Sequence, residues 1–179
     1  MNVSRSLPSL VLVAALASCG RAASSPPAEA SQLRLHAAEA LAAIEGYRAP
    51  AASVESPAAC RASRSGYEAR MEAAMKGISA AAPALDAWTR SRIGPEHGDL
   101  ECVVAALRKE IERHTDIACT APDPGSNRAE AAAHVGVVER WATLLAARAE
   151  EIAGARGEEA PARGPRCVRF ADGSLMYLP

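Results

Sequence analysis

Residues 56–88 read SPAACRASRSGYEARMEAAMKGISAAAPALDAW, and this stretch decides the fold class. Its larger apolar side chains recur at near-heptad spacing, which is typical of a helix with one packed face. Ser56 is a favourable helix cap and Pro57 suits the first helical position, whereas Pro83 is expected to kink or restart the helix. The seam could serve either an oligomer or an intramolecular core. It comprises Cys60, Tyr67, Met71, Ala74, Ile78, Ala81, Leu85 and Trp88.

Three other segments have helical periodicity. One runs from about residue 30 to 47, one begins within residues 96–99, and the last follows a break at residues 120–125, with Ser126 or Asn127 as its cap. Composition favours the same fold class, because alanine supplies 43 of the 179 residues and aromatic residues only 3%. The expected apolar stripes include Leu33, Ile44 and Tyr47 in the first segment, Leu100, Val103 and Leu107 in the next, and Val138, Trp141 and Leu145 in the last.

The connections between these segments are short, which favours antiparallel neighbours. We therefore predict an all-α, up-down antiparallel four-helix bundle, rich in alanine, over residues 30–154. Residues 155–165 have the composition of a linker. The segment 167–178 then predicts a short β-hairpin around Asp172 and Gly173. Two strands of this length are not stable alone, so residues 155–179 are interpreted as a linker and a tail pinned by a disulfide.

The amino-terminal residues indicate export. Arg5 precedes an apolar run over residues 7–17 that is too short to span a bilayer. The run ends in Leu16-Ala17-Ser18-Cys19, which resembles the lipobox of bacterial lipoproteins. This resemblance implies a signal peptide at residues 1–18, cleavage after Ser18, and lipidation of Cys19 with diacylglycerol and a further acyl chain such as palmitate. Gly20 in place of aspartate implies the outer membrane.

Residues 19–29 are small and polar, with two prolines, and are interpreted as a flexible tether that keeps the folded part close to the membrane. The formal net charge of −1 gives no reason to expect nucleic acid as a partner. The expected location is therefore the bacterial cell envelope, lipid-anchored at the outer membrane and facing the periplasm.

Four cysteines remain once Cys19 is lipidated, and in an exported protein they indicate two disulfides. Three pairings are possible from sequence alone. The bundle topology favours Cys60 with Cys119 at one end and Cys102 with Cys167 at the other. Cys102 also lies opposite the apolar stripe of its helix, where it could hold an outer segment such as the tail. No cysteine spacing is typical of a zinc or redox motif.

The sequence does not point to catalysis, since no nucleophile motif or glycine-rich phosphate loop is recognisable. We interpret the chain as a non-enzymatic binding or scaffold module without a cofactor, with a protein of the cell envelope as a potential partner and an undetermined oligomeric state. The alternative is a metal- or haem-binding bundle that uses His114 and His134, which an antiparallel pair brings to similar heights. In the tail, Phe170, Met176 and Tyr177 could cover a groove on the bundle or present an apolar edge to a partner.

Overall fold

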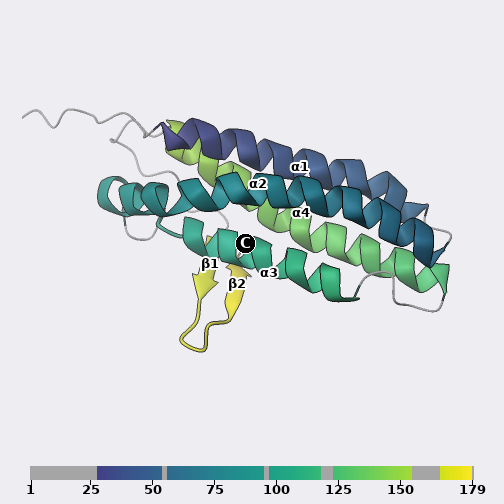
Figure 1. The fold of residues 1–179 in the computed structure, drawn as a ribbon. Coiled ribbons are helices and arrows are strands. Elements are labelled where there is room, and N and C mark those ends of the chain that lie inside the picture. Colours follow the sequence, from purple (N-terminus) through teal and green to yellow (C-terminus); the bar gives the residue numbers. More distant parts are fainter. Residues whose placement is uncertain (1–27, 54–55, 95–96, 118–122, 155–165, 179) are drawn as a thin grey trace, which may run out of the picture.

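The computed structural model describes residues 28–53, 56–94, 97–117, 123–154 and 166–178. Within these ranges the chain forms four helices and one two-stranded sheet, which confirms the predicted all-α bundle with a hairpin tail (Figure 1). Consecutive helices run in opposite directions, and α1 and α3 each lie against both α2 and α4. The elements are α1 (Glu29–Ala52), α2 (Pro57–Arg92), α3 (Leu100–Ile117), α4 (Pro124–Gly154), β1 (Arg166–Arg169) and β2 (Leu175–Leu178).

The core combines many alanines with a smaller set of large side chains. A glycine allows a close contact between two of the helices: the His36 ring of α1 lies against Gly77 of α2, where a Cβ would clash. Almost all of the seam predicted for α2 is buried within a single chain, so it serves an intramolecular core. The largest fully buried side chains come from all four described helices: Leu33, Ile44, Tyr47, Tyr67, Met71, Ile78, Leu85, Leu100, Leu107, Leu145 and Ile152.

Two prolines lie inside helices. The first helix continues past Tyr47 to Ala52 and contains Pro50. The second continues through Pro83, so it does not restart there, and of the two predicted outcomes only the kink remains. An internal proline removes one backbone hydrogen bond and costs about 3 kcal/mol. Ala82 and Leu85 are both buried beside it, so packing on either side holds the two halves in one helix.

The helix starts are set by side-chain caps. The Ser56 hydroxyl accepts a hydrogen bond from the Ala59 backbone N–H at 3.2 Å, as predicted. For α4 the prediction of Ser126 or Asn127 as the cap is wrong, since the helix begins at Pro124. The Asp123 carboxylate caps it instead, accepting a hydrogen bond from the Ser126 N–H at 2.9 Å. A proline directly after the cap fits this arrangement, because its missing N–H is not needed there.

The carboxyl-terminal strands form the predicted hairpin. They pair antiparallel, with Cys167 opposite Tyr177, and β1 lies against α3. Gly173 has a φ of 82°, a backbone conformation that glycine adopts readily, so the turn forms where the sequence predicted it. The turn projects away from the helices (Figure 1). None of the helices in the described ranges is long and apolar enough to cross a membrane.

Candidate binding pocket beside the disulfide

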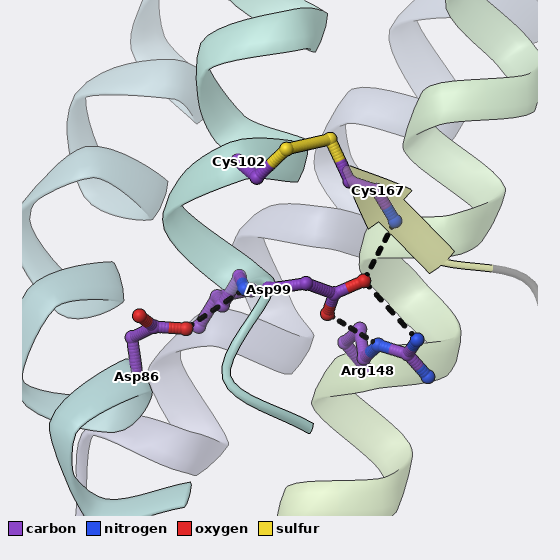
Figure 2. Close-up of a disulfide and its surroundings, with 6 residues drawn as sticks. Asp86, Asp99, Cys102, Arg148 and Cys167 are labelled. Atoms are coloured by element: carbon purple, nitrogen blue, oxygen red, sulfur yellow. Dashed lines mark hydrogen bonds and ion pairs between the residues drawn. A yellow bond between two sulfur atoms is a disulfide. The ribbon is translucent and has the colours of Figure 1, made fainter. Parts of the chain in front are cut away.

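A disulfide joins the first turn of α3 to the hairpin. Cys102 and Cys167 form this bond, with an S–S distance of 2.08 Å and 5.8 Å between the Cα atoms, which confirms the predicted pair (Figure 2). Cys167 is buried and Cys102 is half-buried. Since the two residues are 65 positions apart, the bond fixes the tail of the chain onto the side of the bundle.

The other predicted pair is only partly visible. Cys60 is buried and disulfide-bonded. Because Cys102 and Cys167 bond to each other, neither is its partner. The predicted partner, Cys119, lies outside the described residues, so this pairing remains a prediction.

A buried ion pair fixes the hairpin at a second point. The Asp99 carboxylate, just before α3, accepts hydrogen bonds from Arg148 Nε at 2.7 Å and from the Cys167 backbone N–H at 2.8 Å (Figure 2). The Asp99 and Arg148 side chains are 8% and 7% exposed. Burial disfavours the charged guanidinium of Arg148, but hydrogen bonds and charge from Asp99 and Glu151 outweigh it and raise its pKa. One carboxylate therefore links α3, α4 and β1.

A second buried carboxylate positions the start of α3 from a different helix. Asp86 of α2 accepts a hydrogen bond from the Leu100 N–H at 2.8 Å (Figure 2). It also pairs with Arg90, one turn further along α2. It thus satisfies one of the backbone donors that a helix leaves unpaired at its start. The roles of Asp86 and Asp99 were not predicted from the sequence. The groups that they bind across elements, the Leu100 N–H and the Arg148 guanidinium, are distant from them in the chain.

A pocket of about 690 Å³ opens between α2, α3 and β1, beside the disulfide. Gly98 belongs to its wall, and the Arg90 side chain lies so close to this glycine that a Cβ would clash. The Arg108 guanidinium donates to the Ser79 hydroxyl at 2.5 Å. The pocket is lined by Ser79, Ala82, Pro83, Arg90, Gly98, Asp99, Glu101, Cys102, Val104, Ala105, Arg108, Cys167 and Arg169.

Of the two histidines in the predicted metal or haem site, only His134 has a described side chain. His134 lies edge-on to Tyr67, whose hydroxyl is 3.1 Å from His134 Nε2, and Tyr67 in turn stacks on Tyr47. Burial raises the pKa of both tyrosine hydroxyls. The side chain of His114 lies outside the described residues. Among those that are described, no group of three or more His, Cys, Asp or Glu side chains could hold a metal ion. The metal or haem hypothesis is therefore untested.

Phe170, Met176 and Tyr177 of the tail differ in how far they are covered by the bundle. Tyr177 packs edge-on against Trp141 of α4, with 5.6 Å between ring centroids, and Arg140 lies over the same ring. Phe170 and Met176 are 45% and 47% exposed. The tail thus covers part of the bundle with Tyr177, whereas Phe170 and Met176 are exposed, and their contact with a partner stays a prediction.

Several predicted features lie outside the described residues, namely the signal segment 1–18, Cys19, residues 20–27 of the tether and the linker 155–165. Comparisons with protein-family models, with curated proteins and with solved structures found no match for this chain. The candidate site therefore rests on the pocket and on the residues that hold its walls in place.

Proposed function

We propose that this chain is a lipid-anchored protein of a bacterial cell envelope that acts as a non-enzymatic binding module, and that the pocket beside the disulfide is its binding site. The observation that best supports the binding role is the way in which the walls of that pocket are held in place. Three elements wall it: the disulfide and Asp99 hold β1 beside the start of α3, and Asp86 of α2 binds the first backbone N–H of α3. A site whose walls are fixed in advance loses little entropy when a ligand binds.

Two features support the location. The segment Leu16-Ala17-Ser18-Cys19 has the lipobox pattern, and lipidation of Cys19 would attach the protein to the outer membrane, facing the periplasm. Disulfides persist in oxidising compartments such as the periplasm, so the bonds at Cys60 and at Cys102–Cys167 are consistent with export.

Metabolic labelling with a clickable fatty acid tests the anchor. We expect the full-length protein to be labelled and the Cys19→Ser variant to lose the label. The Cys102→Ser variant is the matched control, because it makes the same replacement of a cysteine by serine outside the lipobox and should keep the label. An unlabelled wild-type protein would contradict the anchor.

Co-purification tests the binding role. The tagged full-length protein is purified from native membranes in a mild nonionic detergent, and bound proteins, small molecules and metals are identified by mass spectrometry. We expect a near-stoichiometric ligand or envelope protein that is lost from Ala105→Trp, which fills the pocket. Ala132→Trp, on the exposed surface of α4, is the control and should retain it. Retention by both variants would exclude the pocket as the site, and stoichiometric metal or haem would favour His114 and His134.

A further inference from the structure

Some of the charged side chains that line the pocket form ion pairs and others do not. Of its two carboxylates, Asp99 is engaged by Arg148 and by the Cys167 N–H, as described above. The other, Glu101, is half exposed and comes no closer than 4.0 Å to Arg90, which itself pairs with Asp86. Neither of the two carboxylates that line the pocket forms an ion pair with the other two arginines of the lining.

Those two arginines are Arg108 and Arg169. Arg108 donates to a neutral hydroxyl, that of Ser79, and Arg169 has no ion pair with any residue that the structure describes. Both line the same pocket although they come from α3 and β1. Arg108 also lines a second hollow with Glu68, Glu72 and Glu112, but it forms no ion pair with a carboxylate in the described part of the chain. Two guanidinium groups that lack such ion pairs beside one cavity favour a ligand that carries negative charge.

The backbone explains why these side chains share the pocket. Cys167 and Arg169 are two residues apart in β1, so they lie on the same face of the strand, and the disulfide holds that face toward α3. Ala105 and Arg108 are three residues apart, and so lie along one side of α3. The disulfide therefore sets the position of Arg169 relative to Arg108.

The rest of the lining fits the body of a small organic molecule. Ala82, Pro83, Val104 and Ala105 form an apolar wall of small side chains. The pocket volume of about 690 Å³ is several times what an inorganic anion needs, and lies within the roughly 300–1,000 Å³ of small-molecule sites. A ligand with one acidic group and a compact body would satisfy both the arginines and this wall.

We propose that the pocket binds a small organic molecule through a phosphate or carboxylate group held by Arg108 and Arg169. This inference rests on the proposed binding function and names its ligand class. Arginine suits either group, because its planar fork of donors matches two oxygens of the same acid. The acid could belong to a free metabolite or to a lipid headgroup, and the two sources share this chemistry.

Nuclear magnetic resonance titration of the ¹⁵N-labelled full-length protein in nonionic detergent tests the proposal at constant ionic strength. The probes are glycerol 3-phosphate for a free phosphate ester, 3-hydroxybutyrate for a free carboxylate and dihexanoylphosphatidylglycerol for a lipid headgroup. The corresponding phosphatidylcholine is the zwitterionic control. We expect shifts confined to residues around the pocket, among them Ser79, Ala105, Arg108 and Arg169. The probe that binds more tightly identifies the source, and either result supports the proposal.

Charge-matched variants identify the binding groups. Arg108→Gln and Arg169→Gln should each weaken binding about tenfold or more, the effect of losing a charge-assisted hydrogen bond. Arg113→Gln on α3 and Arg166→Gln on β1 remove the same charge from the same elements outside the pocket and should change affinity less than about twofold. Arg108→Lys keeps the charge without the planar fork and should give an intermediate loss. It also serves as the test if Arg108→Gln does not fold.

Three outcomes would overturn the proposal: no shifts at the pocket up to 50 mM probe, equal losses in the control variants, or equal binding of phosphatidylcholine. The co-purification experiment separates this failure from failure of the binding function. If Ala105→Trp loses a native ligand while none of the acidic probes binds, the pocket is a binding site but not for an acid. If native ligand and probes are both absent, neither proposal stands.

Discussion

The side of the bundle where α1 packs on α2 and α4 and the corner where α3 meets the hairpin are held by different forces. On the α1 side, buried alanines and large apolar residues such as Leu33 and Ile44 fill the interface, and ion pairs such as Arg48–Glu139 lie half exposed at its edge. Exposed pairs of this kind contribute little. At the α3 corner a buried ion pair and a disulfide make the connection.

The difference explains where the pocket lies. An interface filled by apolar side chains leaves no space, because protein interiors pack as densely as organic crystals. Hydrogen bonds and a disulfide act at a few points only, and can therefore hold two elements together beside an open cavity. The pocket lies next to those points, between α2, α3 and β1.

Removing the disulfide should have the largest effect. The double variant Cys102→Ala/Cys167→Ala frees a loop that spans 65 positions, and we expect a loss of about 4 kcal/mol in the free energy of unfolding, measured by urea denaturation. Hydrogen exchange should show weakened protection in β1 and unchanged protection in α1. Equal loss of protection in both elements would show that the corner and the α1 side are one cooperative unit.

Breaking the ion pair should come next. Asp99→Ala leaves Arg148 buried and removes the acceptor of the Cys167 N–H, and we expect a loss of about 3 kcal/mol, at the lower end for buried pairs because Arg148 keeps Glu151. Glu101→Ala, which removes a half-exposed carboxylate nearby, should change stability by less than about 0.5 kcal/mol. Equal effects in the two variants would contradict a special role for Asp99.

A cavity on the α1 side should cost slightly less. Leu33→Ala removes a fully buried side chain, and we expect a loss of about 2–3 kcal/mol, since small neighbours let the helices close part of the space. Leu35 is 58% exposed on the same helix, so Leu35→Ala is the matched control and should be nearly neutral. Calorimetric or urea unfolding of both variants measures the difference. A near-neutral Leu33→Ala would mean that apolar packing does not hold this side.

The smallest effect is expected at the cap of α4. Hydrogen bonds from Ser126 lower the pKa of Asp123 below its ordinary value of 3.8, so its carboxylate stabilises the folded state at higher pH. This contribution is present above the ordinary pKa and is lost as the pH falls through the lowered one. The stability difference between wild type and Asp123→Asn should therefore be constant above about pH 5 and shrink toward pH 2. A difference that does not vary with pH would exclude an ionised cap.

Much of the fold was predictable because helix faces and turns depend on neighbours in the chain. The apolar spacing of Met71, Ile78 and Leu85 correctly placed these residues in the core. The position of Cys102 opposite the stripe of its helix correctly indicated the Cys167 bond. The helix does not restart at Pro83, because packing with other helices outweighs the local preference of proline for a break.

The candidate site was far less predictable. Asp86 and Asp99 have the same local character as any aspartate near a helix end, and their partners lie 14 and 49 positions away. The cap of α4 was assigned to Ser126 or Asn127 because serine and asparagine suit that position as well as Asp123 does. In addition, no sequence pattern indicated that Arg108 and Arg169 line the same pocket, because they belong to different elements.

The sequence by itself determined that this protein is a helical bundle, which face of each helix is buried, and where the hairpin turns, since these follow from spacing, alanine content and glycine. Only the tertiary structure decided which carboxylate caps α3, which arginine is buried, and that α2, α3 and β1 enclose a pocket. Local sequence restricts backbone angles and side-chain direction, whereas contacts between distant residues depend on how all the helices pack together.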